Sequence, residues 1–415
     1  MTYPDSVQYL YALGNEIKTV KLGLDCIRIL MDALGNPQDT YRVVHVAGTN
    51  GKGSTCAMIE AGLRAAGIRT GLFTSPHLIE PTERIKVGGV DVTREQFRDA
   101  FERVHKASEE LVEAGTLDAH PTYFETVTAM AFLLFQEASI DTLVCEVGLG
   151  GRLDATNVVR PSLCVITPID YDHEQYLGNT LALIASEKAG IMKTGIPVVF
   201  ARQRMEAEWE LTARAGDLKL DPIRTSDFEI ANLGVDRFGC RYEAAGMQVS
   251  CPLAGPHQIE NSLTAAVALR QLGIPPAGIA YTRWPGRLER FEEAPEILLD
   301  GAHNPAGARV LAQYIEQFYR DTRVCLIYGT MRDKAVEEVA GLLFPLAHRL
   351  ILTAPDNPRA LRPESLQQHY PEAIVAPSIA AAIEMAKRDA APEDAIFITG
   401  SLFVVGEARA LLVSS

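Results

Sequence analysis

The sequence predicts an α/β protein with two domains. Its 415 residues are too many for one ordinary hydrophobic core, so two domains are expected. Short apolar, β-branched runs alternate with helical patterns almost from end to end, which is typical of buried parallel strands joined by crossover helices. The apolar content of 47% and the charged content of 22% are those of a soluble globular protein.

The expected strands are short runs rich in Val, Ile, Leu and Thr that stand between the helical patterns. They cover residues 42–47, 70–74, 142–147, 162–167, 197–201, 297–300, 324–328, 349–353 and 395–399. The apolar spacing within Phe124–Glu137 predicts one of the crossover helices.

The pattern changes between residues 227 and 251, where it alternates and is interrupted by glycines, which predicts an antiparallel hairpin or a small sheet. A helix is expected over Ile259–Leu272. The Pro- and Gly-rich stretch 273–287 has the composition of a hinge or linker. We therefore expect a first domain over residues 1–285 and a second α/β domain over residues 286–415.

Composition also excludes several classes of protein. The net charge of −14 argues against a nucleic-acid or anionic-membrane partner, because both require a basic face. No apolar run approaches the roughly 20 residues that span a bilayer, and the N-terminal residues lack the pattern of a secretory signal. The seven cysteines form no CxxC pair, so buried thiols in a reducing cytoplasm are expected.

A glycine-rich turn follows the first strand, RVVHVA, and precedes a helical pattern. The turn consists of Gly48, Thr49, Asn50, Gly51, Lys52, Gly53, Ser54 and Thr55. Glycines let backbone N–H groups face phosphate oxygens, and a helix N-terminus adds partial positive charge. Lys52 is placed to reach the β- and γ-phosphates, and Ser54 or Thr55 to bind Mg²⁺. The spacing departs from GxxxxGK[ST], so a turn that binds nothing is the alternative.

HVAGTNGKGST resembles the nucleotide loop of the Mur ligase superfamily, in particular that of the folylpolyglutamate synthase and dihydrofolate synthase family, which shares the shortened spacing. Further similar motifs follow in the same order: YLYALG near the N-terminus, GNPQ at Asn36 and GSLFVVGEAR near residue 400. The resemblance implies a Mur-ligase-like P-loop ATPase domain with a parallel-sheet core, and a smaller C-terminal Rossmann-like domain that ligates glutamate.

Three polar residues follow predicted strands, at the edge where an open α/β sheet binds its ligand. They are Ser75 in TSPHL, Glu146 in VCEVG and His173 in YDHEQ. The resemblance implies two Mg²⁺ ions, one held by Ser54, Ser75 and Glu146 and the other by Glu146 and His173. A histidine ligand would also suit Mn²⁺. The alternatives are a turn-forming serine, a capping or salt-bridging carboxylate and a hydrogen-bonded loop histidine.

Lys188, in IASEKAGIMK, lies on an expected helix, where a lysine is usually solvated and paired with an acid. The resemblance implies that it is the carbamylated lysine of the family, whose carbamate is an anionic metal ligand. The sequence shows the acceptor amine and leaves its modification open.

Two stretches resemble the pterin-binding parts of the family. Residues 75–89 are similar to the loop that closes over the pterin, in which Arg84 and Lys86 supply positive charge for an anionic substrate; a solvated strand edge is the alternative. Phe124 and Glu125 are similar to pterin-contacting positions, although Phe124 also suits a core.

The segment GGRLDATN, which contains Arg152 and Asp154, resembles the form found in bacterial enzymes that also make dihydrofolate from dihydropteroate. Asp154 would accept hydrogen bonds from the donor edge of the pterin. An aspartate in a local side-chain turn is the alternative for this residue.

Three motifs near or beyond the linker resemble the other half of the family's ATP site. Asn261 in HQIENS contacts the nucleotide in the family, and Arg287 in WPGRLER is a candidate clamp on the γ-phosphate. Asp300 and His303 in LLDGAHNP resemble positions used for the ribose and for the nucleotide–glutamate region. A helix cap, a surface arginine and helix-start turn residues are the alternatives.

The resemblance implies an ATP-dependent ligase that adds L-glutamate to folates, and to dihydropteroate as well, through an acyl phosphate. Lys52, Lys188, His173 and Arg287 are the expected catalytic residues, and a monomer is expected. Domain closure about the linker would keep water from the acyl phosphate.

The alternatives are an enzyme with dihydrofolate synthase activity alone, a Mur ligase for UDP-linked precursors and an inactive nucleotide-binding module. Against the second, the loop at Gly48 leaves no room before it for a UDP-binding domain. Against the third, the residues expected to act in catalysis are all present.

Overall fold

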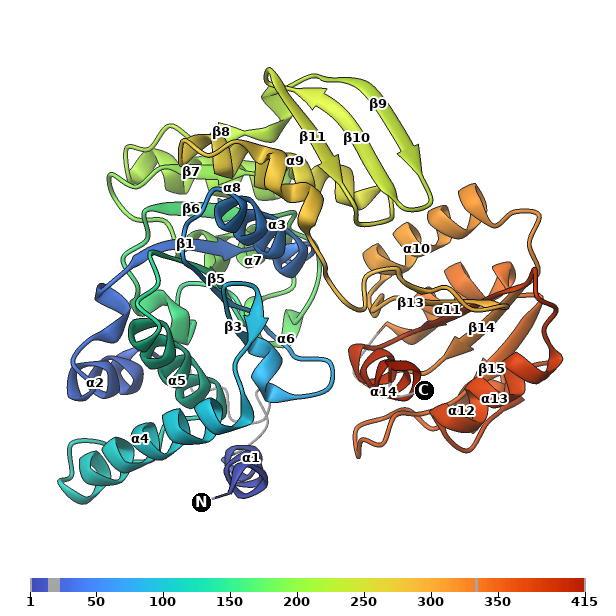
Figure 1. Ribbon diagram of the computed structural model, residues 1–415, viewed down its shortest axis with the longest axis horizontal. Coiled ribbons are helices and arrows are strands. Elements are labelled where there is room, and N and C mark those ends of the chain that lie inside the picture. Colours follow the sequence, from blue (N-terminus) through green and yellow to red (C-terminus); the bar gives the residue numbers. More distant parts are fainter. Residues whose placement is uncertain (1, 14–22, 333–334, 414–415) are drawn as a thin grey trace. The chain divides into compact units, whose positions relative to one another are not determined.

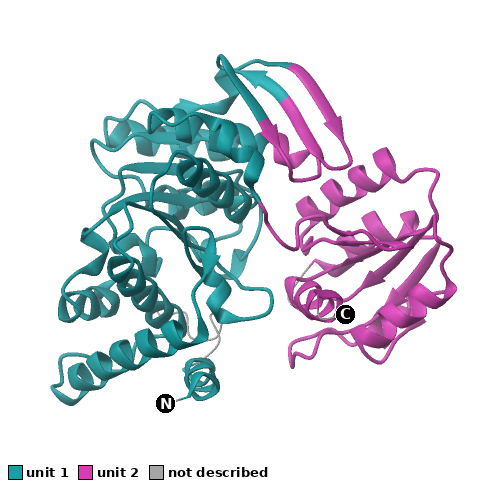
Figure 2. Ribbon diagram, viewed as in Figure 1, with its two compact units in different colours: residues 1–231, 242–249, 260–282 teal, residues 232–241, 250–259, 283–415 magenta. Residues whose placement is uncertain are grey.

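The computed structural model describes residues 2–13, 23–332 and 335–413. It divides into two compact units (Figure 2). The first unit contains residues 1–231, 242–249 and 260–282, and the second contains residues 232–241, 250–259 and 283–415. The division into domains 1–285 and 286–415 stays a prediction. Gly14, at the end of the YLYALG motif, lies outside the described residues.

The first unit is built on an eight-stranded sheet in the order β4-β3-β2-β5-β1-β6-β7-β8 (Figure 1). Its strands are β1 Arg42–Ala47, β2 Thr70–Phe73, β3 Ile85–Val87, β4 Val90–Asp91, β5 Thr142–Glu146, β6 Leu163–Ile166, β7 Val198–Phe200 and β8 Ile223–Arg224. All neighbouring pairs from β2 to β8 are parallel, and β3 and β4 extend the edge antiparallel. Central strands such as β1 are almost wholly buried, which explains their continuous apolar sequence.

Helices cover both faces of this sheet. The helices of the first part of the chain are α1 Tyr3–Ala12, α2 Asp25–Ala33, α3 Lys52–Ala65, α4 Arg94–Glu113, α5 Tyr123–Glu137, α6 Glu174–Leu177, α7 Leu181–Ala189, α8 Met205–Asp217 and α9 His257–Gln271. Short 3₁₀ turns are η1 Pro37–Asp39, η2 Pro81–Arg84, η3 Ala155–Val158, η4 Thr225–Asp227 and η5 Pro276–Tyr281. Side chains of α2, α4 and α5 share one core with β1 and β5, and α7 and α8 share another with β6 and β7.

A small sheet separates the first helices and strands from the last ones along the chain. It has the order β11-β10-β9, with β9 Ile230–Asp236, β10 Gly239–Ala244 and β11 Met247–Cys251. Two-residue connections join consecutive strands, so the strands run antiparallel, since parallel neighbours need a long crossover. The antiparallel sheet expected between residues 227 and 251 is therefore present.

The second unit contains a six-stranded sheet in the order β12-β13-β17-β14-β15-β16. Its strands are β12 Glu289–Phe291, β13 Glu296–Leu299, β14 Val324–Tyr328, β15 Arg349–Leu352, β16 Ile374–Val375 and β17 Ala395–Thr399. All pairs are parallel except β12 with β13. The helices are α10 Pro305–Phe318, α11 Val336–Leu343, α12 Pro363–Gln367, α13 Ile379–Asp389 and α14 Leu402–Val413, with the 3₁₀ turn η6 Phe344–Leu346.

The structure confirms the predicted α/β class, with a parallel-sheet core in each unit. The seven cysteines are free thiols, and six of them are buried. Among the described helices, none has the length and apolar character needed to cross a membrane.

Candidate active site

The glycine-rich turn leads directly from β1 into α3. Gly48 has φ +148° and Gly51 has φ +82°, and both lie where a side chain would not fit. A Cβ on Gly48 would lie 1.9 Å from Thr167 Oγ1, and one on Gly51 would lie 2.2 Å from Asn261 Oδ1. α3 begins at Lys52 with Gly51 as its N-cap, and no side chain caps it. Two glycines at positive φ followed by an uncapped helix N-terminus are typical of a backbone turn that binds an anion, because the helix dipole places partial positive charge at the turn.

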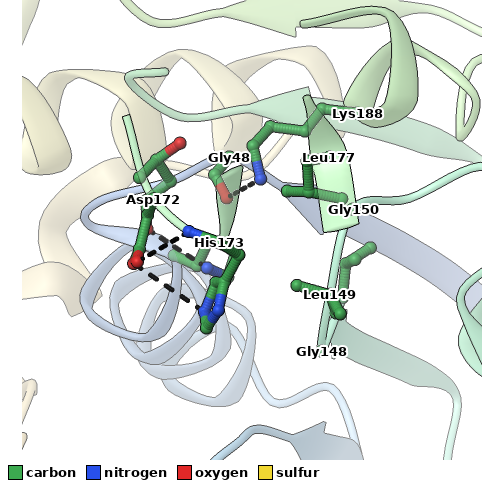
Figure 3. A pocket seen from close by; sticks show the side chains of 11 residues that line it. Gly48, Gly148, Leu149, Gly150, Asp172, His173, Leu177 and Lys188 are labelled. Atoms are coloured by element: carbon green, nitrogen blue, oxygen red, sulfur yellow. Dashed lines mark hydrogen bonds and ion pairs between the residues drawn. The ribbon is translucent and has the colours of Figure 1, made fainter. Parts of the chain in front are cut away.

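Two lysines donate hydrogen bonds to carbonyl groups of this turn. Lys52 Nζ donates to Thr49 O at 3.2 Å, and Lys188 Nζ donates to Gly48 O at 2.8 Å (Figure 3). Lys188 is only 4% exposed. Burial, and secondarily the positive charge of Lys52, lowers the pKa of Lys188 from 10.5 to about 7. The alternative of a solvated lysine is therefore wrong: Lys188 is a buried amine that faces the glycine-rich turn Gly48–Thr55, called the phosphate turn from here on.

A small cavity of about 30 Å³ opens beside these lysines (Figure 3). It is lined by Gly48, Thr49, Lys52, Val147, Gly148, Leu149, Gly150, Asp172, His173, Leu177 and Lys188. These residues come from the phosphate turn, the turn after β5, the segment around α6, and α7. The cavity thus lies at the carboxyl edge of the parallel strands, where α/β sheets bind ligands.

Two of the predicted metal ligands meet at this edge. Ser75 N donates to Glu146 Oε2 at 3.0 Å, which joins the ends of neighbouring strands β2 and β5. Glu146 is 4% exposed and Ser54 is 3% exposed. Within the described parts of the chain, no three His, Cys, Asp or Glu side chains converge on one point. A cation here would therefore be held by a single carboxylate together with hydroxyls, water and phosphate oxygens, a hard-oxygen set that suits Mg²⁺.

His173 is the N-cap of α6 and adopts a left-handed conformation with φ +53°. Its backbone N–H donates to Asp172 Oδ1 at 2.9 Å, and its Nε2 lies 3.8 Å from Asp172 Oδ2. Asp172 also lines the cavity and favours the charged form of Lys188. Sequence reasoning missed Asp172, although its position directly before His173 in a loop after a predicted strand was a usable signal.

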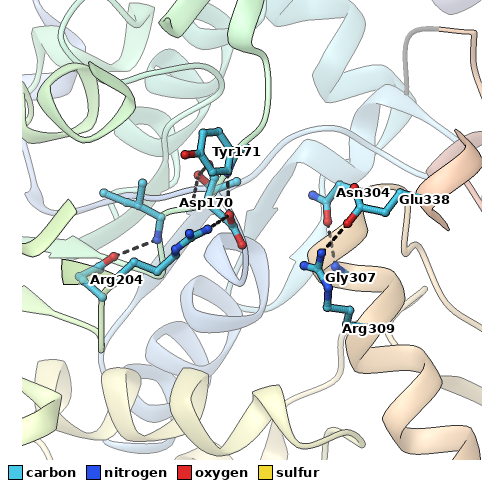
Figure 4. Close-up of polar contacts among 10 residues, drawn as sticks. Asp170, Tyr171, Arg204, Asn304, Gly307, Arg309 and Glu338 are labelled. Atoms are coloured by element: carbon cyan, nitrogen blue, oxygen red, sulfur yellow. Dashed lines mark hydrogen bonds and ion pairs between the residues drawn. The ribbon is translucent and has the colours of Figure 1, made fainter. Parts of the chain in front are cut away.

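A second segment missed from the sequence anchors the phosphate turn. Thr49 Oγ1 donates to Asp170 O at 3.0 Å and accepts from Asp170 N at 3.1 Å. The Thr49 hydroxyl therefore binds both backbone groups of Asp170. Arg204 Nη1 lies 3.1 Å from Asp170 Oδ1, and the Arg204 guanidinium lies over the Tyr171 ring (Figure 4). No local motif indicates these contacts.

The turn Gly148–Asn157 gathers several of the predicted acceptor-binding residues. Asp154 is 5% exposed; its Oδ2 accepts Leu149 N at 2.8 Å and its Oδ1 accepts Thr156 N at 3.0 Å. Burial raises the pKa of the Asp154 carboxyl against the lowering effect of these bonds. The alternative of a local side-chain turn is thus present, and it fixes the carboxylate in place.

Arg152, on the same turn, forms an ion pair with Glu187 of α7 at 2.8 Å. Phe124 lies over Gly148, where a Cβ would be 2.5 Å from its ring. Glu125, by contrast, closes a capping box at the start of α5, with Oε2 accepting Thr122 N and Thr122 Oγ1, both at 2.8 Å. In this structure, therefore, the carboxylate of Glu125 caps the N-terminus of α5.

Arg84 lies at the end of η2 and is 3% exposed. Its Nε donates to His77 Nδ1 at 2.9 Å, and its guanidinium lies 5.3 Å from the centre of the Tyr123 ring. The alternative of a solvated strand edge is therefore wrong for Arg84, because its guanidinium is buried between an imidazole and an aromatic ring. Its role towards the acceptor stays a prediction.

The predicted nucleotide residues fall into both units. Asn261, 3% exposed on α9, lies against Gly51 within the first unit. In the second unit, Asp300 Oδ2 accepts Leu288 N and Asp300 Oδ1 accepts Ala302 N, both at 3.0 Å. Arg287 Nη1 lies 2.2 Å from the position of a Cβ on Gly301. Asp300 therefore joins the turn that carries Arg287 to the turn that precedes α10.

His303 also belongs to this second group, with its Nδ1 2.8 Å from Gly301 O. Burial raises the pKa of Asp300, opposed by the nearby Arg287. Asn304 then caps α10 by accepting Gly307 N at 2.8 Å (Figure 4). The structure thus brings Arg287, Asp300 and His303 together within the second unit.

Comparisons with known proteins agree with this geometry. Residues 46–269 match the Mur ligase middle domain, and residues 286–402 match the Mur ligase glutamate ligase domain. The chain is 38% identical over 359 residues to dihydrofolate synthase/folylpolyglutamate synthase of Bacillus subtilis, covering 82% of this chain and 83% of that protein.

Solved structures are similar over the whole length. Folylpolyglutamate synthase of Mycobacterium tuberculosis complexed with ADP has a TM-score of 0.90 and 33% identity, covering 99% of this chain and 98% of that one. Escherichia coli FolC in complex with DHPP and ADP has a TM-score of 0.86 and 30% identity, with the same coverage of 99% and 98%. The chain belongs to the folylpolyglutamate synthase and dihydrofolate synthase family of Mur ligases.

Proposed function

We propose that this chain is an ATP-dependent ligase that joins L-glutamate to folates and to dihydropteroate. In the first step a carboxylate oxygen of the acceptor bonds to the γ-phosphorus while the bond from that phosphorus to ADP breaks. In the second step the glutamate amine bonds to the acyl carbon, loses a proton, and phosphate leaves. The products are the amide, ADP and phosphate.

The observation that carries this proposal is the phosphate turn with its two lysines. Gly48 and Gly51 adopt positive φ and let the turn pack closely against Thr167 and Asn261, and Lys52 stands at the uncapped start of α3. Phosphoryl transfer from ATP needs positioning and charge stabilisation rather than a protein nucleophile. The turn provides both, and the relatives with this fold include structures complexed with ADP.

Magnesium fits the oxygen-rich edge beside this turn. Ser54, Ser75, Glu146 and His173 are the residues proposed to hold it, in two ions, with Mn²⁺ as a substitute favoured by the imidazole. Bound there, the cations would neutralise charge on the transferred phosphoryl group. The chain's own contribution is the Ser75–Glu146 contact, which fixes the carboxylate at the strand end.

Lys188 is proposed to carry a carbamate. Carbamylation requires a neutral amine that attacks CO₂ and releases one proton. Burial favours the neutral amine of Lys188 near neutral pH, and the amine lies beside the phosphate turn. Lys52, Lys188, His173 and Arg287 are the proposed catalytic residues.

The acceptor is proposed to bind at Arg84, Phe124, Glu125, Arg152 and Asp154. Of these, Phe124 and Asp154 are best supported, because Phe124 lies against Gly148 and Asp154 accepts a hydrogen bond from Leu149, and both Gly148 and Leu149 line the cavity. Asn261, Arg287, Asp300 and His303 are proposed to bind ATP together with residues Gly48–Thr55. We also propose a cytoplasmic monomer with small-molecule partners and no nucleic-acid or membrane partner.

A parallel assay tests the function. The purified chain, ATP, Mg²⁺ and L-glutamate are offered dihydropteroate, tetrahydrofolate or no acceptor, and ADP and the glutamylated product are both quantified. We expect product with both acceptors. Product with dihydropteroate alone would assign dihydrofolate synthase activity only, and ADP release without product would contradict the ligase proposal.

A further inference from the structure

A chain of hydrogen bonds joins three buried side chains, two from the Gly148–Asn157 turn and one from β1 beneath it, and two of the three have no part in the function described so far. His45, Thr156 and Asp154 are 0%, 0% and 5% exposed. His45 Nε2 lies 2.9 Å from Thr156 Oγ1, and Thr156 Oγ1 lies 2.5 Å from Asp154 Oδ1. His45 and Thr156 are separated by 111 residues in the sequence.

The direction of these hydrogen bonds follows from counting protons. The hydrogen-bond partners of the Asp154 carboxylate are all donors: the N–H groups of Gly148, Leu149 and Thr156, and the hydroxyl of Thr156. Such a set favours the ionised carboxylate, which can only accept. The single proton of the Thr156 hydroxyl is therefore directed at Asp154. The contact between His45 and Thr156 must then be donated by the imidazole, through Nε2–H.

The other ring nitrogen of His45 supports the same arrangement. Among the described residues, His45 Nδ1 is buried and has no hydrogen-bond partner. A buried lone pair without a partner is tolerated better than a buried N–H without one. Burial, with a smaller effect of Lys193, lowers the pKa of His45 to about 3, so the ring is neutral. The ring therefore carries its one proton on Nε2.

The position of His45 in the sheet explains how a ring fits there. In register with His45 are Cys145 on β5 and Cys164 on β6, both small and buried. Their side chains lie on the same face as the imidazole, because residues in register on parallel strands face the same side. The ring occupies this space and reaches the turn above. β1 then continues into the phosphate turn three residues later.

We propose that His45 is a positioning residue for the acceptor site. It donates a hydrogen bond to Thr156 and so directs the Thr156 hydroxyl at Asp154, which fixes the carboxylate that receives the N–H donor edge of a flat heteroaromatic acceptor. A hydroxyl that accepts a hydrogen bond is also a stronger donor. The inference rests on the proposed function for the role of Asp154 and extends it to two residues beneath the site.

Paired variants of similar shape test the donor. His45→Gln retains an N–H at a similar reach, and His45→Met has a similar length without a donor. We expect His45→Met to raise the KM for the pteroyl acceptor about fivefold, the effect of one lost hydrogen bond. The kcat and the KM for ATP should stay within about twofold, because the phosphate turn is untouched. His45→Gln should restore most of the acceptor KM.

Variants of Thr156 test the same hydrogen-bond chain independently. Thr156→Val removes the hydroxyl and should raise the acceptor KM as His45→Met does, whereas Thr156→Ser should not. Thr128→Val is the matched control, because Thr128 is a fully buried hydroxyl on α5 with no hydrogen-bond partner among the described residues. A general loss of stability would lower the fraction of active enzyme, and with it the apparent kcat, and would leave both KM values unchanged.

The proton position is measured on the wild-type protein, so it does not depend on how the variants fold. Nitrogen-15 NMR of histidine-labelled protein, with His45→Gln to identify the signal, should show Nε2–H and a bare Nδ1. A proton on Nδ1, or an acceptor KM unchanged in His45→Met while the wild type is active, overturns the inference alone. A wild type that glutamylates no pteroyl acceptor overturns the proposed function, and the positioning role with it.

Discussion

The two units each contain a parallel strand that turns into a helix, yet the helices begin in opposite ways. α3 follows β1 and begins after Gly51, with no side chain capping its first turn. α10 follows β13 and its neighbouring turn, and Asn304 caps it by accepting Gly307 N. Glycine at an N-cap keeps the space beside the first N–H groups open, whereas asparagine fills that space and uses one N–H.

This difference separates two kinds of strand–helix turn. The turn before α3 is shaped for an anion, with two lysines donating to its carbonyls. The turn before α10 holds Asp300 and His303 in fixed positions through backbone hydrogen bonds. Changes at the first turn should therefore alter nucleotide use, whereas a change in the cap of the second should mainly alter stability.

The largest effect is expected for Lys52→Ala. Removing the positive charge that we propose acts on the transferred phosphoryl group should lower the rate of glutamate ligation by about 10²- to 10³-fold. The measurement is glutamylated product per unit time at saturating ATP. Lys106→Ala is the control, because Lys106 is an exposed lysine on α4. Ligation at the wild-type rate in Lys52→Ala would refute the assignment of the turn.

Gly51→Ala should have the next largest effect. Its φ of +82° is strained for alanine, and the new Cβ would lie 2.2 Å from Asn261 Oδ1. We expect the KM for ATP to rise at least about tenfold. Gly67→Ala is a close control at the far end of α3, with φ +81° and open space around the position. Both variants should lose about 1 kcal/mol of stability from backbone strain. An equal change in KM for ATP in both would show that strain alone is responsible.

Lys188 should impose a pH dependence on stability. Its pKa in the folded state is about 7, below the ordinary value of 10.5, so the unfolded chain binds more protons between these values. The destabilisation is fully present below pH 7 and is lost as the pH rises towards 10.5. The free energy of unfolding of wild type relative to Lys188→Met should therefore rise by up to about 1.4 kcal/mol per pH unit above pH 7.

Denaturant unfolding at pH 7, 8 and 9 measures this difference. The same preparation with ¹³C-bicarbonate tests the carbamate by ¹³C NMR. The carbamate signal should be absent from Lys188→Met and present in Lys193→Ala, in which another lysine of lowered pKa is removed. A difference in unfolding free energy that does not change with pH would contradict a buried neutral amine.

The smallest effects are expected at α10. Asn304→Ala removes the cap and should cost about 1 kcal/mol of stability, whereas Asn304→Asp should keep it. Arg309→Ala, on the same helix, breaks an exposed ion pair with Glu338 (Figure 4) and should change stability by less than about 0.5 kcal/mol. Thermal unfolding of the three variants ranks them. A larger loss in Arg309→Ala than in Asn304→Ala would contradict the view that the cap dominates this turn.

Local pattern was sufficient for much of the fold. The strands Val324–Tyr328 and Ala395–Thr399 have the predicted bounds, because a continuous apolar run in the sequence is typical of a buried strand. The phosphate turn could also be predicted from the sequence, because its glycines and its lysine lie within one short segment. Glu125 shows an unused signal: Thr122 three residues earlier forms a capping box with it, a pattern visible in the sequence.

The sequence by itself therefore determined the α/β class, the order of the motifs and the glycine-rich turn, because these depend on neighbouring residues. Only the tertiary structure decided that Asn261 lies against Gly51, that Lys188 is buried beside Gly48, and that His45 meets Thr156. These contacts join segments more than 100 residues apart; His45 and Thr156, for example, are separated by 111 positions in the sequence. The burial of these side chains and their long-range hydrogen-bond partners, and hence their pKa values, are properties of the packed chain and have no signature in any local window of residues.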